Sequence, residues 1–321
     1  MRHLLLAAAL AFGLAGAAQA GPAEDEAGLA ALRAADTRLA AIAYRLTVAN
    51  AALCAVTAPV TGLRLHAAAQ YNARFRAAAV RLFGLGDGPA ILAVAPDSPA
   101  EAAGLRAGDW LVAIGDGAVA ASTTADAAAT GLEAALARGP VDVTVVRDGR
   151  RLTVPLVGRT GCAADVVLNT AGGFNAEADG RRILIGAGLA SYVASDDEFA
   201  AVVGHELAHN ALGHRARLDA EGAGHGLSRM VGRGAALVRR TEREADYLSL
   251  YLMARAGYDV HAASAFWSRF GREHGPGPFG TSDHPSWRKR TRDLDRAAGE
   301  IDGKRVRGEP LLPGTLWPEG E

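Results

Sequence analysis

The chain has 321 residues, of which 50% are hydrophobic and 21% are charged, and its formal net charge at pH 7 is −1. This composition is typical of a packed globular protein, and the length suggests about two domains. Because the chain carries no excess of basic residues, neither nucleic acid nor an anionic membrane surface is expected as a partner.

Residues 1–20 have the pattern of a secretory signal peptide. A short positive region, Met1–His3, precedes an apolar run from Leu4 to Ala18, and Ala18-Gln19-Ala20 fits the small-x-small cleavage rule. The run is short for a membrane anchor, and no later stretch reaches the ~18 to 20 uninterrupted apolar residues of a spanning helix. We therefore expect cleavage near Ala20 and a periplasmic or secreted protein with no transmembrane segment in its mature chain.

The next segment has a helical pattern. Apolar residues in 24–53 recur at near-helical spacing, namely at Leu29, Leu32, Leu39, Ile42, Leu46 and Leu53. The polar face of this helix is not basic, so the pattern does not favour a helix that lies on a membrane. We expect residues 21–83 to form an N-terminal helical segment that packs on the C-terminal domain.

Residues 84–158 have the pattern of a small β-rich domain. Two strands and a helix are predicted over Ile91–Val94, Trp110–Ile114 and Thr123–Arg138. Alternating apolar residues then flank an Asp148-Gly149 turn, which predicts a β-hairpin.

One run in this region resembles the bacterial PDZ domains of secreted proteases. It extends from Ser98 to Asp109 and reads Ser-Pro-Ala-Glu-Ala-Ala-Gly-Leu-Arg-Ala-Gly-Asp. PDZ domains accept an extended peptide by strand addition, and backbone N–H groups of a Gly-containing loop hold its carboxylate. The resemblance implies that Gly84, Leu85 and Gly86 belong to this loop. The alternative is a spacer that binds nothing, in which the glycines only turn the chain.

Cys54 and Cys162 are the only cysteines, and they flank the PDZ-like region. In an oxidising compartment an isolated pair is a candidate disulfide. The bond would make the PDZ-like region an insertion into the C-terminal domain. The alternative is two buried free thiols, because spacing in the sequence does not establish that the two side chains approach each other.

Residues His205 to His209 read His-Glu-Leu-Ala-His. On a helix, positions four apart share one face, so His205 and His209 can offer ring nitrogens to one metal ion. Two histidines and a carboxylate are the ligands of catalytic zinc sites that keep one position open for water. Ser195 and Glu198 form a capping box before the pentad, and Gly213 stands where a glycine commonly ends a helix.

Two zinc-peptidase patterns differ in the third ligand. The metzincin pattern fails by register, because it requires Gly and His where this chain has Leu212 and Arg215. The other pattern takes a glutamate from a following helix, on which Glu242 and Asp246 share a face one turn apart. We assign Glu242 to the metal, and Asp246 as the acceptor of a hydrogen bond from a ligand histidine.

Two nearby polar residues are expected at the surface. Glu244 points away from the face that carries Glu242, and His214 follows the zinc helix, where a histidine favours the helix dipole. The linker between the two helices, residues 219–236, is rich in glycine, so its conformation is not predicted.

These motifs resemble, in order, those of the HtpX-like and CaaX-prenyl-endopeptidase family of gluzincin zinc metallopeptidases. They are His205–His209, Glu242–Asp246, Ala256–Asp259 and Asp283–Pro285. The resemblance covers about residues 160 to 296. It implies that residues 159–321 form a mainly helical zincin-type domain with a small edge sheet and one Zn²⁺ ion. Together with the PDZ-like region, the expected fold class is α+β.

The resemblance also implies roles for two other segments. Residues 175–183 are similar to the strand-turn-strand that precedes the zinc helix in this family, which places Asn175 and Ala176 on the edge that pairs with an extended substrate. His284, followed by Pro285, matches a late histidine near the metal that either ligates it or stabilises the oxyanion. The alternative for His284 is an ordinary loop residue.

The expected reaction is hydrolysis of peptide bonds in protein or peptide substrates by a zinc-activated water, with Glu206 as the general base. A serine or cysteine mechanism is not supported, because the chain has no Gly-x-Ser-x-Gly motif and neither cysteine lies in a nucleophile motif. Quality control of envelope proteins is one setting for such an enzyme. The alternative is a weakly proteolytic or non-proteolytic chaperone-like or peptide-binding factor that retains the metal site, although an intact Glu206 favours the enzyme.

Overall fold

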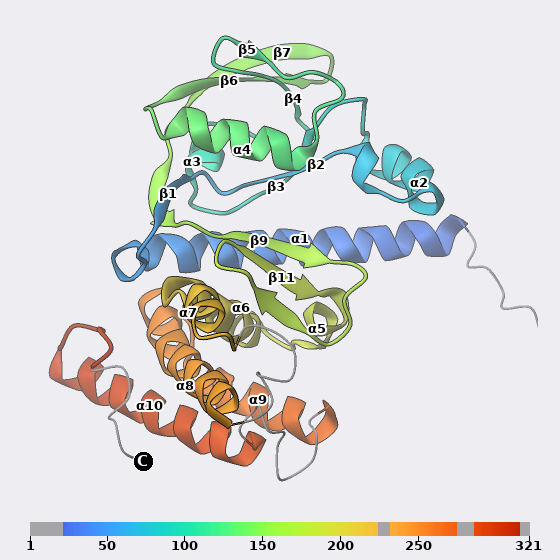
Figure 1. Ribbon diagram of the computed structural model, residues 1–321. Coiled ribbons are helices and arrows are strands. Elements are labelled where there is room, and N and C mark those ends of the chain that lie inside the picture. The colour runs from blue at the N-terminus through green and yellow to red at the C-terminus, as the bar shows by residue number, and fades with distance from the viewer. Residues whose placement is uncertain (1–21, 224–231, 275–285, 315–321) are drawn as a thin grey trace, which may run out of the picture.

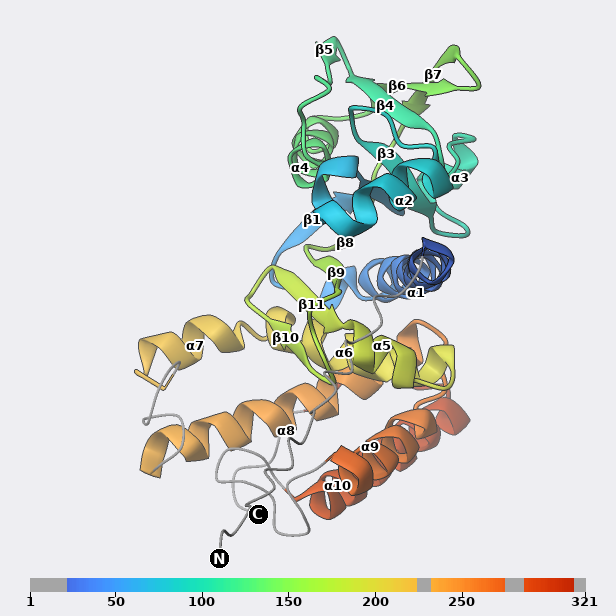
Figure 2. The ribbon, with the colours of Figure 1, turned by 90° about the vertical axis from the view of Figure 1, so that its right-hand side faces the viewer.

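The computed structural model of the chain describes residues 22–223, 232–274 and 286–314. Figures 1 and 2 show a β-rich module, the long helix α1 (Pro22–Ala49) beneath it, and a mainly helical domain on the other side of α1. The predicted α+β fold class is confirmed.

Helix α1 contributes to the cores on both of its sides. Leu39, Ile42 and Leu46 are at most 1% exposed and belong to the core of the helical domain, whereas Leu29 packs with Phe83 near the β-rich module. The helix predicted within residues 24–53 is therefore confirmed. It ends at Ala49, and a short 3-10 turn, η1 (Ala51–Leu53), follows it.

The β-rich part is built on a six-stranded antiparallel sheet, which we call the PDZ-like module (residues 63–156). Its strands are β2 (Leu63–His66), β3 (Ala90–Val94), β4 (Trp110–Ile114), β5 (Gly117–Ala118), β6 (Val141–Arg147) and β7 (Arg150–Leu156). They follow the order β2-β3-β4-β6-β7, and β5 pairs with β4. The helical elements are η2 (Ala68–Gln70), α2 (Ala73–Phe83), α3 (Pro99–Ala102) and α4 (Ala125–Leu136).

The strands and the helix predicted for this module are present, and two strands, β2 and β5, are added. Strand β2 pairs with β3 in the register Leu63↔Val94 and His66↔Ala90. The sheet therefore begins upstream of residue 84, where we predicted the boundary of the module. Asp148 and Gly149 turn the chain between β6 and β7 with φ angles of 50° and 74°, as a tight hairpin requires.

A two-stranded ribbon joins the PDZ-like module to the rest of the protein. Strand β1 (Thr57–Val60) pairs antiparallel with β8 (Arg159–Cys162). Beside this ribbon, Cys54 and Cys162 form the predicted disulfide. Because the chain leaves and returns through the ribbon, the PDZ-like module is an insertion between α1 and the helical domain.

The helical part begins with a three-stranded sheet, and we call it the zincin-like domain (residues 165–307). Strand β9 (Asp165–Asn169) lies parallel to β11 (Arg182–Gly186), and β10 (Ala176–Ala178) pairs antiparallel with β11 at the edge. The helices are α5 (Ala187–Tyr192), α6 (Asp196–Ala211), α7 (His214–Ala220), α8 (Gly232–Arg255), α9 (His261–His274) and α10 (Trp287–Arg307).

The core of the zincin-like domain lies between α6, α8, α9 and the small sheet. Phe199, Leu207, Tyr251 and Phe266 are at most 1% exposed there. The glycine-rich segment 219–236 includes the end of α7 and the start of α8. Residues 224–231 within it lie outside the described part of the chain. Of the helices in the described ranges, none is both long enough and apolar enough to cross a bilayer.

Candidate metal centre

Local sequence sets both ends of helix α6. The Ser195 side chain accepts a hydrogen bond from the Glu198 backbone N–H at 3.1 Å, which caps the first turn. The Glu198 carboxylate also accepts two hydrogen bonds of 2.6 Å from Arg269, which ties α6 to α9. At the other end, Gly213 has a φ of 62° and turns the chain out of the helix.

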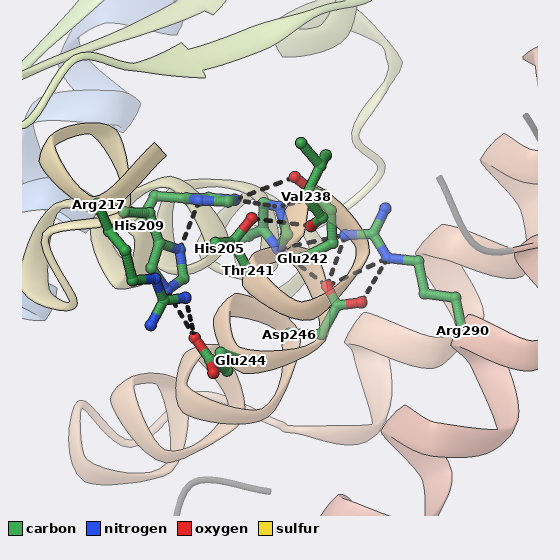
Figure 3. Close-up of polar contacts among 10 residues, drawn as sticks. His205, His209, Arg217, Val238, Thr241, Glu242, Glu244, Asp246 and Arg290 are labelled. Atoms are coloured by element: carbon green, nitrogen blue, oxygen red, sulfur yellow. Dashed lines mark hydrogen bonds and ion pairs between the residues drawn. The ribbon is translucent and has the colours of Figure 1, made fainter. Parts of the chain in front are cut away.

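Three side chains converge on one point between α6 and α8 (Figure 3). The Nε2 atoms of His205 and His209 lie 3.1 Å apart. The carboxylate oxygens of Glu242 lie 3.5 Å from the first nitrogen and 3.6 Å from the second. Tetrahedral zinc with bonds of ~2.0 to 2.1 Å separates its ligand atoms by about 3.3 Å. The donor set therefore fits one zinc ion.

Glu206 lies beside these donors and lines the same cavity. Its side chain is buried, and burial raises the pKa of the Glu206 carboxyl to about 7. A carboxylate whose pKa lies near neutral pH suits proton transfer, because it can accept a proton and release it again.

The other ring nitrogen of His205 is held by Asp246, as the sequence predicted. His205 Nδ1 lies 2.9 Å from Asp246 Oδ1. Burial opposes the charged form of His205, but hydrogen bonds to Asp246 and Glu242 raise its pKa to about 10. A metal ion at Nε2 would replace the proton that this environment favours.

Arg290 of α10 holds Asp246 in turn, and the sequence analysis missed it. Arg290 donates three hydrogen bonds to Asp246, of 2.6, 2.9 and 3.1 Å, and lies over the Trp267 ring at 3.3 Å from the centroid. Burial alone would raise the pKa of Asp246, but the charge of Arg290 lowers it below its usual value. Sequence spacing carries no signal for this contact, because only the packing of α10 against α8 creates it.

His214 and Glu244 are not surface residues, so both of those predictions were wrong. His214 is 0% exposed and Glu244 is 3% exposed. The turn at Gly213 directs His214 back toward the zinc helix, and its Nδ1 lies 2.8 Å from His209 Nδ1. Its Nε2 lies 3.2 Å from Glu244 Oε2. The second histidine of the pentad therefore also has a buried partner.

The protonation of His214 and Glu244 follows from burial and from the nearby Arg217 and Arg240. Burial lowers the pKa of His214, and it lowers that of His209 to about 3. Burial alone would raise the pKa of Glu244, but hydrogen bonds from His214, Arg217 and Arg240 lower it to about 2. Figure 3 shows Arg217 and Glu244 in contact on the far side of His209.

A cavity of about 540 Å³ opens beside the donor set. Asn175 and Ala176, which were expected at the substrate edge, line it, and β10 has β11 as its one sheet neighbour in the described chain. Five aromatic side chains also line this cavity, namely Phe174, Trp267, Phe270, His274 and Trp287. His284 lies outside the described residues, so its predicted role at the metal stays a prediction.

A second cavity, of about 470 Å³, is lined by the edge strand β2 and helix α4 of the PDZ-like module, and helix α1 and strand β1 also line it. The predicted loop at Gly84, Leu85 and Gly86 does not line it. Gly84 ends α2, Leu85 is buried in the core with Phe83, and Gly86 packs against the Trp110 ring. This loop therefore has a packing role, because the strand edge and the helix that form a groove lie elsewhere.

The zincin-like domain forms one wall of the second cavity. Arg181, just before β11, and Arg182, its first residue, form ion pairs with Glu133 and Asp126 of α4. Asp165 of β9 accepts hydrogen bonds from Arg64 of β2 at 3.1 Å and from Arg182 at 2.9 Å. Helix α4 of the PDZ-like module, which borders the groove, is thus joined to the hairpin of β10 and β11 at the edge of the zincin-like domain.

The chain matches two known families. Residues 165–238 and 224–298 match Peptidase family M48, and residues 91–147 match the PDZ domain. The M48 match contains the donor set and is coarser than the HtpX-like assignment that the motifs implied.

Two curated proteins are similar to the chain. It is 31% identical over 134 residues to the Mitochondrial metalloendopeptidase OMA1 of Arabidopsis thaliana, which covers 36% of this chain and 27% of that protein. It is 29% identical over 149 residues to the protein of the same name from Schizosaccharomyces pombe, which covers 39% of this chain and 44% of that protein. The chain spans less than half the length of either relative. It therefore joins a region similar to family M48 metallopeptidases, which carries the His205, His209 and Glu242 donor set, to a region similar to PDZ domains.

Proposed function

We propose that this protein is a zinc-dependent endopeptidase that hydrolyses peptide bonds in protein or peptide substrates. One observation carries the proposal: His205, His209 and Glu242 converge at zinc-binding distances, and the buried carboxylate of Glu206 lies beside them. The matches to metallopeptidases support the same reaction class.

When bound at this site, zinc supplies a Lewis acid that polarises the scissile carbonyl and lowers the pKa of water from 15.7 toward about 7. The Glu206 carboxylate accepts the proton of the attacking water and returns it to the nitrogen of the leaving amine. Asp246 and Arg290 keep His205 oriented during the cycle. The reaction needs no covalent intermediate with the protein.

We propose that an extended substrate pairs with the free edge of β10. Asn175 and Ala176 line the cavity that holds the donor set, and the outer edge of β10 offers backbone groups to a peptide strand. The aromatic side chains that line the same cavity suit an apolar substrate side chain.

We propose that the PDZ-like module binds a substrate or partner peptide in the groove between β2 and α4. Strand β2 has β3 as its one sheet neighbour in the described chain, so its other edge can accept a strand. The cavity that contains this groove has a volume of about 470 Å³, which suits a few peptide residues.

We further propose a periplasmic or secreted location, with quality control of envelope proteins as the setting. The signal-peptide pattern of residues 1–20 supports it. The Cys54–Cys162 disulfide also supports it, because such bonds persist in oxidising compartments.

The test of the function measures zinc content and casein hydrolysis by the purified protein and two variants. Glu206→Gln is expected to keep its zinc and to lose activity by about 10² to 10⁴-fold, the usual contribution of a general base. Glu309→Gln, at an exposed site, is the matched control and should behave like the wild type. Zinc without hydrolysis in the wild type would favour the non-proteolytic alternative, and full activity in Glu206→Gln would reject the mechanism.

A further inference from the structure

The two histidines of the pentad have different partners at their second ring nitrogen. His205 Nδ1 faces the carboxylate of Asp246 at 2.9 Å. His209 Nδ1 instead faces the ring of another histidine, His214, at 2.8 Å. A carboxylate can only accept a hydrogen bond, whereas an imidazole can either donate or accept, so the second arrangement needs a defined tautomer.

Ligation of zinc fixes that tautomer. If Nε2 of His209 binds the metal through its lone pair, the ring proton of His209 must be on Nδ1. His214 Nδ1 must then accept the hydrogen bond, so the proton of His214 is on Nε2. That nitrogen lies 3.2 Å from Glu244 Oε2, which can accept it. One set of proton positions therefore satisfies every group in the series.

Glu244, the last residue of the series His209, His214 and Glu244, is held in place by several contacts. Glu244 is buried, and it also accepts hydrogen bonds from Arg217 of α7 and Arg240 of α8. These contacts keep the carboxylate charged and immobile, so it can only act as an acceptor. His214 itself is fully buried, so solvent does not compete for its ring nitrogens.

We propose that His214 is a positioning residue for the zinc site: it accepts the Nδ1 hydrogen of His209 and so aims Nε2 of that ligand at the metal, and Glu244 anchors His214. This inference rests on the proposed zinc site. The inference goes beyond that site because it assigns part of the zinc affinity to His214 and Glu244, which do not touch the metal.

The test measures the zinc affinity of the purified full-length protein by competition with a chromogenic chelator. His214→Leu removes the acceptor and is expected to weaken zinc binding by about 10- to 100-fold, as losses of ligand partners usually do. His214→Asn can place its amide oxygen near the former Nδ1, so its affinity should stay close to that of the wild type. His214→Gln reaches toward Glu244 instead, so it should bind zinc as weakly as His214→Leu.

A second readout and a matched control separate positioning from general damage. The visible absorption of the Co²⁺-substituted protein reports ligand geometry, and it should change in His214→Leu but not in His214→Asn. His261→Leu removes an exposed histidine that pairs with Asp302 at 2.8 Å, and it should leave zinc affinity unchanged.

Each outcome decides the proposal. Wild-type zinc affinity and an unchanged Co²⁺ spectrum in His214→Leu would overturn it and leave the proposed function intact. If His214→Leu does not fold, equal zinc affinities of the Asn and Gln variants would overturn it as well. A wild-type protein that binds no zinc would reject the proposed function and this inference together.

Discussion

Arg182 Nη2 lies 2.9 Å from Asp126 Oδ2, and this ion pair joins the edge hairpin of the zincin-like domain to the groove helix of the PDZ-like module. Arg182 also binds Asp165 at 2.9 Å, and Asp165 binds Arg64 of β2. A peptide in the groove between β2 and α4 would therefore lie against residues that belong to both modules.

These contacts are expected to differ in strength. Asp126 is exposed, so Asp126→Asn should change the free energy of unfolding by less than about 1 kcal/mol. Asp165→Asn should cost more, because that carboxylate is partly buried and accepts hydrogen bonds from two arginines. Urea unfolding of both variants checks the order. A larger loss in Asp126→Asn would mean that the Asp165 network is not the main polar link between the modules.

The third metal ligand makes a separate prediction. Glu242→Ala is expected to lose zinc and activity together, because two histidines alone leave the ion with weak coordination. Metal analysis after dialysis, beside the Glu206→Gln variant that should keep its zinc, measures the difference. Full zinc stoichiometry in Glu242→Ala would show that the third ligand lies elsewhere.

The disulfide is expected to stabilise the protein without supporting the metal. Cys54 and Cys162 are separated by 108 residues, and closing a loop of about 100 residues contributes up to ~4.7 kcal/mol in the chain-entropy account. The double variant Cys54→Ala and Cys162→Ala should melt at a lower temperature, and the PDZ-like module should become more accessible to proteases. Its zinc content should be unchanged, because neither cysteine belongs to the donor set, and loss of zinc would contradict this picture.

The pH dependence of stability should reflect a buried histidine near α1. His66 is 1% exposed and bonded to Tyr71, and burial together with the charge of Arg33 lowers its pKa from 6.5 to about 4. The unfolded chain therefore binds this proton near pH 6.5, whereas the folded chain binds it only near pH 4. Stability is lost as the pH falls through this window, by about 2 kcal/mol between pH 7.5 and 5.

Asp36 of α1 acts in the opposite direction. Burial raises the pKa of Asp36 from 3.8 to about 6, against the charge of Arg64, so the folded state gains stability as the pH falls from 6 toward 4. Relative to the wild type, Asp36→Asn should lose more stability in acid and His66→Gln should lose less. Thermal melting at pH 7.5 and 5 measures both, and shifts in the same direction would contradict the assignment.

Local sequence determined the elements of the site and much of their chemistry. The spacing of His205 and His209 places two ring nitrogens on one helix face, and the spacing of Glu242 and Asp246 does the same on α8. Ser195 and Gly213 set the two ends of the zinc helix. These features depend on residues a few positions apart, so helix geometry alone was enough to predict them.

The tertiary structure decided which polar residues serve those ligands. His214 and Glu244 read as surface residues because nothing in their local sequence shows that α7 folds back over α8. Arg290 lies 44 positions after its partner Asp246, beyond the reach of any periodic pattern. Sequence reasoning looked for the peptide-binding loop at Gly84–Gly86 and did not find the groove for the same reason, because β2 lies at the sheet edge only through its pairing with β3 across α2. Burial and hydrogen-bond partners depend on which elements cover a residue, and that is settled only when the helices and the sheets pack together.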